Sequence, residues 1–158
     1  MIRPGAAALV AAAWAASGAA FAEPTCRTAS PEVERVVAGK ARELAMTEHC
    51  QFRRYDALDD VDADGKEDFV VLFTLEGPNG ANRHVSFLAL FPSSAPDRPA
   101  AVVRTGERGQ RDPVDVRVER GRIVLATLEY RPGDPMCCPS GKGRIVYLWK
   151  DGRLRRGR

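Results

Sequence analysis

The spacing of the hydrophobic positions changes once along the chain. Between residues 31 and 46, valine, alanine and leucine recur every three or four positions, which is the period of an amphipathic helix. Ser30-Pro31-Glu32 begins this stretch with a hydroxyl cap, a proline that needs no hydrogen-bond partner and an acidic side chain, and all three favour a helix start. The pattern therefore predicts one amphipathic helix over residues 31–46.

From residue 52 onward the hydrophobic pattern is typical of β-strands. Residues 69–75 and 85–91 are continuous apolar runs on either side of a Gly-Pro-Asn-Gly turn, which predicts an antiparallel pair of buried strands. Shorter or alternating segments predict further strands at 52–55, 100–104, 114–118, 123–130 and 145–149. We expect one α+β domain, with the N-terminal helix packed on a mostly antiparallel sheet of six or seven strands.

The first 22 residues have the features of an export signal. Arg3 precedes an Ala-rich apolar stretch at 6–16, which is about half the length of ~20 residues that a spanning helix needs. Ala20-Phe21-Ala22 then supplies the small residues that signal peptidase accepts. We predict a cleaved Sec-type signal peptide at 1–22 and a single domain at 23–158 that ends in a basic tail at 153–158. A periplasmic or secreted location follows from this prediction.

Composition and charge exclude several classes of protein. Among the 158 residues, 44% are hydrophobic and 28% are charged, which excludes wholesale disorder. The 24 basic and 21 acidic residues give a net charge of +3, too balanced for a dedicated nucleic-acid binder. After residue 22 no apolar stretch is long enough to span a bilayer. The expected partner is an unknown envelope protein or polymer, and the oligomeric state stays open.

An acidic loop is the most informative motif of the chain. It reads DVDADGKED over residues 60–68, and Gly65 permits the tight curl that brings alternate side chains together. Calcium prefers such oxygen ligands, and an EF-hand is excluded because Val71 occupies its glutamate position. The predicted Ca²⁺ ligands are the carboxylates of Asp60, Asp62, Asp64 and Asp68 and the backbone carbonyl of Lys66. The alternative is an acidic turn in which the aspartates only cap backbone N–H groups.

Two motifs together resemble known families. The D-x-D-x-D-G-x-x-D spacing resembles the calcium loop of FG-GAP and related secreted β-repeats, although only one copy is present. Together with Asp-Pro-Met-Cys-Cys-Pro-Ser at 134–140, it resembles small uncharacterised bacterial exported and envelope proteins that pair an acidic loop with a CCPS motif. The resemblance implies the compartment and the fold class, and it implies no established activity.

In an exported chain, four cysteines indicate disulfides. Neighbouring cysteines rarely bond each other because the small ring strains the peptide between them. The default prediction therefore ties Cys137 and Cys138 each to Cys26 or Cys50. The competing pairing is Cys26–Cys50 with a Cys137–Cys138 bond, and both remain open at this point.

Catalytic machinery is scarce in the sequence. His49 and His84 are the two histidines, and Ser140 lacks the context of a nucleophile elbow. We therefore predict a non-enzymatic binding or envelope-associated module with a structural Ca²⁺ loop. One alternative is an inhibitor of an extracellular hydrolase that inserts the loop at 131–143. The other is a thiol or metal-binding protein that uses Cys137 and Cys138.

Overall fold

The computed structural model describes residues 30–49, 54–78 and 83–157, which form one helix and nine strands. The elements are α1 (Pro31–Leu44), β1 (Thr47–Glu48), β2 (Tyr55–Asp59), β3 (Asp68–Glu76), β4 (His84–Phe91), β5 (Ala101–Glu107), β6 (Arg111–Glu119), β7 (Arg122–Glu129), β8 (Gly141–Lys150) and β9 (Arg153–Arg156). The predicted signal peptide, Cys26 and Cys50 lie outside the described residues.

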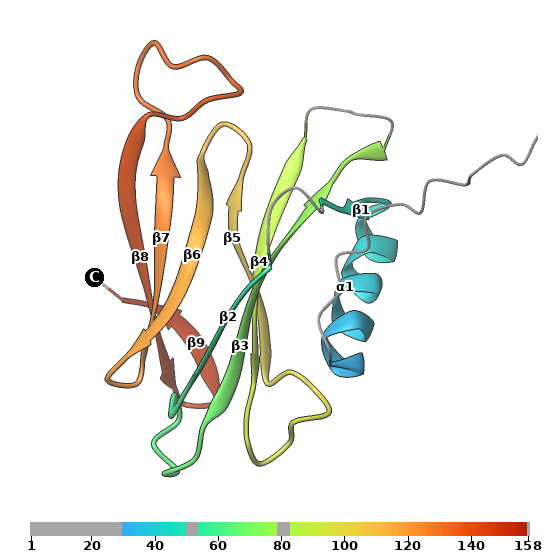
Figure 1. Ribbon diagram of the computed structural model, residues 1–158, viewed down its shortest axis with the longest axis vertical. Coiled ribbons are helices and arrows are strands. Elements are labelled where there is room, and N and C mark those ends of the chain that lie inside the picture. The colour runs from blue at the N-terminus through green and yellow to red at the C-terminus, as the bar shows by residue number, and fades with distance from the viewer. Residues whose placement is uncertain (1–29, 50–53, 79–82, 158) are drawn as a thin grey trace, which may run out of the picture.

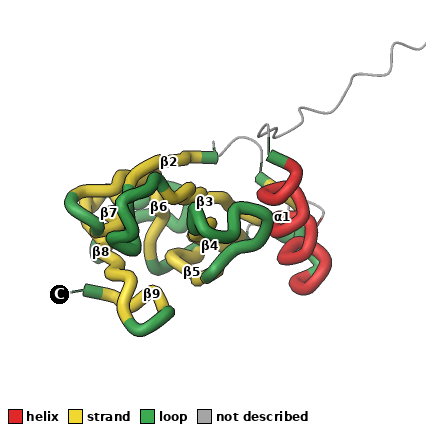
Figure 2. Tube along the Cα trace, turned by 90° about the horizontal axis from the view of Figure 1, so that it is seen from below, coloured by secondary structure: helices red, strands yellow, loops and turns green. Residues whose placement is uncertain are grey.

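The nine strands belong to one antiparallel sheet that folds back on itself. Its order is β1-β3-β4-β5-β6-β7-β8-β9, and β2 pairs with the same strand, β3, as β1 does. β5 and β6 share the single residue pair Glu107–Arg111, so the sheet turns sharply there. The strands from β6 onward therefore face those before them, with β2 alongside β6 and β5 alongside β9 (Figures 1 and 2).

Two hydrophobic cores lie on opposite faces of β3 and β4. Val71, Phe73 and Leu75 face α1, which packs on this side of the sheet through Val33 and Val37 (Figure 1). The alternate residues of β3 and β4 face the interior between the two halves of the sheet, where they meet side chains of β6, β7 and β8. Because both faces of β3 and β4 are covered, these strands are continuous apolar runs, as the sequence predicts.

The α+β prediction agrees with this mostly antiparallel sheet and single helix, but the predicted count of six or seven strands is wrong. β1 has 2 residues, which are too few to show a hydrophobic pattern in the sequence. β2 begins at Tyr55 rather than at residue 52. β9 (Arg153–Arg156) occupies the segment expected as a basic tail, since pairing with β8 requires no apolar run.

The helix ends two residues before the predicted limit of 46. Ala45 takes the left-handed conformation, with φ 51°, and its N–H closes the last turn on Arg42. Met46 is buried in the core beside α1 and follows the helix instead of extending it. Within the described ranges, no helix has the length and apolar character needed to cross a membrane.

A buried arginine ties α1 to the sheet. The guanidinium of Arg54, with 6% of its side chain exposed, donates to Glu34 of α1 and to Glu48 of β1. Burial by itself disfavours the charge, but the hydrogen bonds to Glu48 and Glu34 raise the pKa of Arg54 above its usual range. The single guanidinium therefore compensates one of the two negative charges on this side of the helix.

Candidate metal centre

The acidic loop connects β2 to β3 in a hairpin. The last strand pair is Asp59–Asp68, and the residues between them make the turn. Ala63 and Gly65 both have positive φ, 65° and 83°, so the backbone curls twice within three residues. Glycine is suited to this conformation, as the sequence predicts for Gly65, whereas the left-handed Ala63 was not expected.

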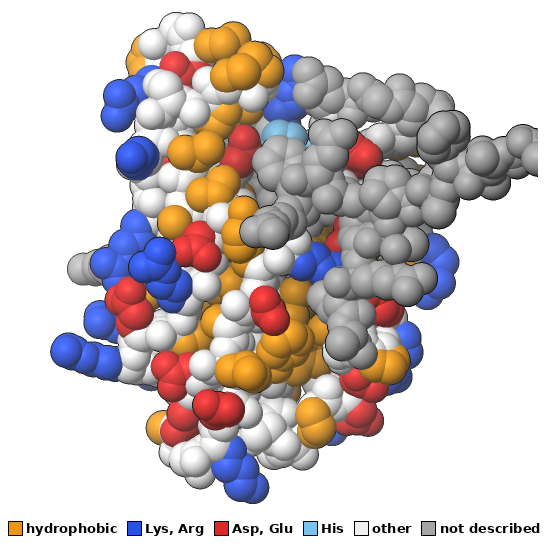
Figure 3. All heavy atoms as spheres, in the orientation of Figure 1, with side chains coloured by type: hydrophobic (Ala, Val, Ile, Leu, Met, Phe, Trp, Pro, Cys, Tyr) orange, Lys and Arg blue, Asp and Glu red, His pale blue; other side chains and the backbone are white. Residues whose placement is uncertain are grey.

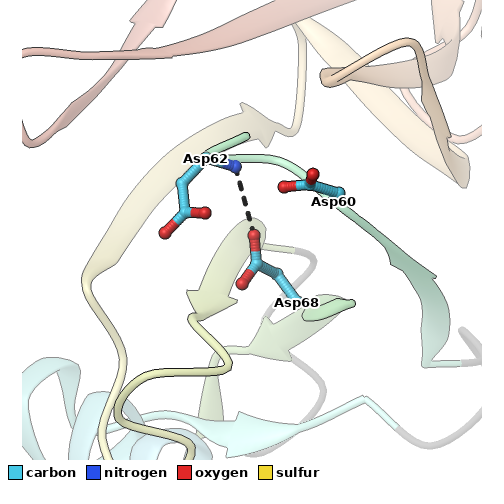
Figure 4. A group of neighbouring side chains, drawn as sticks. All are labelled: Asp60, Asp62 and Asp68. Carbon is cyan, nitrogen blue, oxygen red and sulfur yellow. Dashed lines mark hydrogen bonds between the residues drawn. The ribbon is translucent and has the colours of Figure 1, made fainter. Parts of the chain in front are cut away.

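Three carboxylates of this hairpin converge. One oxygen from each of Asp60, Asp62 and Asp68 lies within 4.8 Å of the others, and the three side chains turn toward a common space (Figure 4). Desolvation, with added repulsion from the charge of Asp68, raises the pKa of Asp62. Acidic side chains gather on the surface at this end of the molecule (Figure 3). The arrangement therefore concentrates negative charge that a cation would relieve.

Asp68 is the fixed point of the cluster. Its side chain is fully buried, and one oxygen accepts the N–H groups of Val61 at 2.9 Å and Asp62 at 3.2 Å. The other oxygen accepts the N–H of Ser93 at 2.8 Å. Among the described residues no cationic side chain forms an ion pair with Asp68. Its negative charge is therefore held by backbone dipoles alone.

Of the five predicted ligands, Asp64 and Lys66 lie outside the cluster of three side chains. Asp64 accepts the N–H of Lys66 at 2.8 Å and the hydroxyl of Ser93 at 3.0 Å. Asp60 accepts the N–H groups of Asp64 and Gly65. These bonds are the ones that the acidic-turn alternative predicts, and they also preshape the loop. A ligand role for the carbonyl of Lys66 stays a prediction.

Ser93 is the residue of the candidate site that the sequence does not reveal. It follows β4, 25 positions after Asp68, and belongs to no motif. The register of β3 and β4 pairs Phe69 with Phe91, so the chain that leaves β4 passes beside the start of β3. The β2–β3 and β4–β5 loops consequently lie at the same end of the molecule (Figure 1). Strand register, which depends on the whole sheet, brings Ser93 to this site.

The second motif lies at the opposite end, in the loop that projects beyond β7 and β8 (Figure 1). Cys137 and Cys138 are both exposed and are bonded to each other. The default pairing with Cys26 or Cys50 is therefore wrong, and this bond belongs to the competing pairing. Asp134 closes the loop by accepting the N–H groups of Arg131 and Ser140, both at 2.8 Å. The closed loop keeps the two sulfur atoms beside each other.

Both histidines face carboxylates. His49 Nε2 lies 3.4 Å from Glu76, and His84 Nε2 lies 2.5 Å from Asp112 across two strands. The pairing of His84 with Asp112 was not predicted, because it depends on the fold of β5 and β6. The hydroxyl of Ser86 is engaged elsewhere, with Thr74 at 2.9 Å. The described geometry therefore shows a His–Asp pair, and Ser86 is bonded to Thr74.

The hairpin cluster is the strongest candidate site of the chain. Its carboxylates supply oxygen ligands for a hard cation, and its backbone N–H donors hold one of them in place. No protein-family model matches this chain, and comparisons with curated proteins and with solved structures also give no match.

Proposed function

We propose that the protein is an exported, non-enzymatic binding or envelope-associated module whose loop at residues 60–68 holds a structural Ca²⁺. The observation that carries this proposal is the convergence of Asp60, Asp62 and Asp68 within 4.8 Å on a preshaped hairpin. Calcium takes six to eight oxygen ligands, roughly 2.3–2.6 Å away, and flexible carboxylates are its usual partners. The cluster supplies three of these groups.

The position of the loop supports a structural role. Ser93 links the loop to the segment after β4, so an ion here would fasten β2, β3 and the β4–β5 loop together. The charge of the three carboxylates would then be compensated, and the repulsion that adds to the effect of desolvation on the pKa of Asp62 would be relieved. A cation would therefore stabilise the fold without any reaction.

The compartment belongs to the same proposal. The signal-like segment at 1–22 and the resemblance to exported envelope proteins both favour the periplasm or the cell exterior. Extracellular modules commonly bind calcium with dissociation constants of about 10⁻⁴–10⁻³ M, which suits a loop of three convergent carboxylates.

Thermal unfolding of the oxidised protein with EDTA and with about 5 mM Ca²⁺ tests the proposal. At a calcium concentration ten times the dissociation constant, binding to the folded state adds about 1.4 kcal/mol, so the melting temperature should rise by several degrees. Asp62→Asn should reduce this rise, because it removes one of the three converging negative charges without touching the bonds that Asp68 accepts.

Asp97→Asn is the matched control, since it removes an exposed carboxylate from the β4–β5 loop outside the cluster. It should keep the full response to calcium. If calcium does not change the melting temperature of wild type, the loop is only an acidic turn. If both variants lose the calcium response equally, the cation is attracted non-specifically. Mg²⁺ at the same concentration separates a calcium site from simple screening.

The bond between Cys137 and Cys138 favours a second candidate, a thiol–disulfide function. Both residues are exposed in a projecting loop, so a thiol reagent has access to the bond. Reduction would add two electrons and two protons to give two thiols. Equilibration with glutathione redox buffers and thiol titration should then show two titrating thiols that Cys137→Ser/Cys138→Ser lacks. A bond that stays oxidised throughout the glutathione range would indicate a purely structural role.

The same loop supports the alternative of a hydrolase inhibitor. It projects beyond the sheet, Asp134 stiffens it, and 50% of the Met136 side chain is exposed. Recovery of one hydrolase in equimolar amount from envelope extract, lost in Met136→Asp, would favour the inhibitor. Retention on cell-wall polymer or membrane would favour the envelope module.

A further inference from the structure

A small hollow lies at the corner where the sheet turns from β5 to β6. Its volume is about 200 Å³, and β9 closes it from the side opposite β5. Its lining includes three arginines, Arg104, Arg111 and Arg156, the hydroxyl side chains of Thr105 and Tyr147, and one acidic residue, Glu107. The hollow is far from the acidic hairpin in sequence and is independent of the calcium proposal.

A residue that lines this hollow carries a buried hydroxyl. Thr105 sits at the irregularity where β5 leaves its regular pairing with β4, between the residues opposite Ser86 and Phe87. Its side chain is 6% exposed, and among the described residues its Oγ1 has no hydrogen-bond partner. Buried polar atoms are normally satisfied, so this oxygen leaves the corner one hydrogen-bond partner short.

Two arginines meet a buried tyrosine at the same place. Tyr147 of β8 is paired with Arg156 of β9, and only 8% of the tyrosine is exposed. The positive charges of Arg156 and Arg111 both act on the Tyr147 hydroxyl. Burial outweighs them and raises the pKa of Tyr147, so its hydroxyl keeps its proton and can donate it to a ligand.

The two arginines differ from Arg104 in their charge balance. Arg104 forms an ion pair with Glu107, which also accepts from Gln110. For Arg111 and Arg156, the described residues include no carboxylate within ion-pair distance. Uncompensated guanidinium groups beside a partly enclosed hollow favour an anion, and their planar donors match the oxygens of phosphate, sulfate or carboxylate.

We propose that this corner binds an oxyanion group of a ligand, with Arg111 and Arg156 neutralising its charge and the hydroxyls of Thr105 and Tyr147 completing its hydrogen bonds. The volume accommodates one such group rather than a whole cofactor. Arg156 also borders a larger open hollow of about 580 Å³, together with Arg122 and Arg144. The remainder of an anionic ligand extends into this second hollow.

Calorimetric titration of the full chain with inorganic phosphate, sulfate and acetate at constant ionic strength tests the proposal. Arg156→Gln should weaken the binding of the preferred anion by about tenfold, because one charge-assisted contact is lost. Arg153→Gln is the matched control: it removes a charge from the same strand, outside both hollows, and should change the affinity less than about twofold.

Thr105→Val separates binding from folding. It keeps the shape of the side chain and removes a hydroxyl that has no partner in the described structure, so the melting temperature should not fall while anion binding weakens. Tighter binding of phosphate and sulfate than of acetate would show that the bound group is tetrahedral. Tighter binding of acetate would show that it is a carboxylate, and both outcomes support the site. Absence of binding of all three at about 50 mM, or equal loss in Arg153→Gln, would overturn it.

Discussion

Two carboxylate-rich regions of this protein balance their charge in different ways. Beside α1, Glu34 and Glu48 share the guanidinium of Arg54, which is 6% exposed, so one of their two negative charges is compensated inside the fold. In the β2–β3 hairpin, Asp60, Asp62 and Asp68 converge, and the donors around them are mainly backbone N–H groups. Backbone dipoles hold these carboxylates in place but leave their net charge uncompensated.

The difference separates a structural cluster from a candidate binding site. A carboxylate cluster that contains its own cationic side chain attracts a cation from solution less strongly. A cluster held only by dipoles retains a favourable place for a mobile cation. The predictions below test this distinction, from the largest expected effect to the smallest.

Arg54→Met should give the largest loss of stability. It would leave Glu34 and Glu48 without the shared guanidinium, and because Glu34 is 46% exposed the loss should be about 2–3 kcal/mol, below that of a fully buried pair. Chemical denaturation measures the loss, which should be the same with EDTA and with calcium. Arg35→Met, which removes an exposed partner of Glu32, should cost less than about 1 kcal/mol. Equal losses in the two variants would contradict the buried role of Arg54.

Asp68→Asn should have the next largest effect, since it damages both the fold and the site. The amide keeps one acceptor oxygen, but its NH₂ group would face an N–H donor that the carboxylate accepts. The expected loss is about 2 kcal/mol in EDTA, together with loss of the calcium response. Full stability in EDTA would show that the three N–H bonds contribute little.

The raised pKa of Asp62 predicts a smaller effect on stability. Here acidification should increase the free energy of unfolding. Its pKa in the folded protein is raised above the ordinary 3.8, so the folded state binds the proton more tightly than the unfolded state. In EDTA, the unfavourable contribution of Asp62 is therefore present at neutral pH and is relieved as the pH falls through the folded value toward 3.8.

The free energy of unfolding of wild type minus that of Asp62→Asn measures this contribution. The difference should increase on acidification by less than about 1 kcal/mol, and calcium should abolish the increase by compensating the charge. A difference that stays constant, or decreases, as the pH falls would show that neither desolvation nor the neighbouring carboxylates raise the pKa of Asp62 in the folded protein.

Asp134→Asn should give the smallest effect on global stability, because this carboxylate is exposed. Hydrogen bonds from the backbone of Arg131 and from Ser140 lower the pKa of Asp134, so its contribution is present above the ordinary 3.8 and is lost as the pH falls through the lowered value. The melting temperature should be unchanged, while the Ser140 amide should exchange faster with solvent. A cooperative loss of stability would show that the β7–β8 loop is coupled to the core.

Much of the fold was predictable from local pattern. The runs at β3 and β4 are buried on both faces, and they stand out as uninterrupted apolar residues. Pro31 at its first turn indicates where the helix begins, although the helix ends at Leu44, earlier than predicted. The strand predicted at 52–55 shares only Tyr55 with β2, and β9 was predicted as a basic tail, because an edge strand needs only backbone pairing and few apolar residues.

The candidate site was predictable only in part. Asp60, Asp62 and Asp68 converge because their spacing and Gly65 act within a few residues of chain. Asp64 turns instead to Ser93, a partner that strand register supplies from another loop. The bond between Cys137 and Cys138 was predicted only as the competing pairing, since the closure of their loop by Asp134 was not foreseen.

The sequence by itself determined the helix, the buried strands and the curled acidic loop, because each depends on neighbours a few positions apart. Only the tertiary structure decided which distant groups meet: Ser93 with Asp68, His84 with Asp112, and Arg111 with Tyr147 and Arg156. These meetings depend on the register of β3 and β4 and on the sharp turn between β5 and β6. Such long-range geometry results from the packing of the whole sheet, which no local pattern encodes.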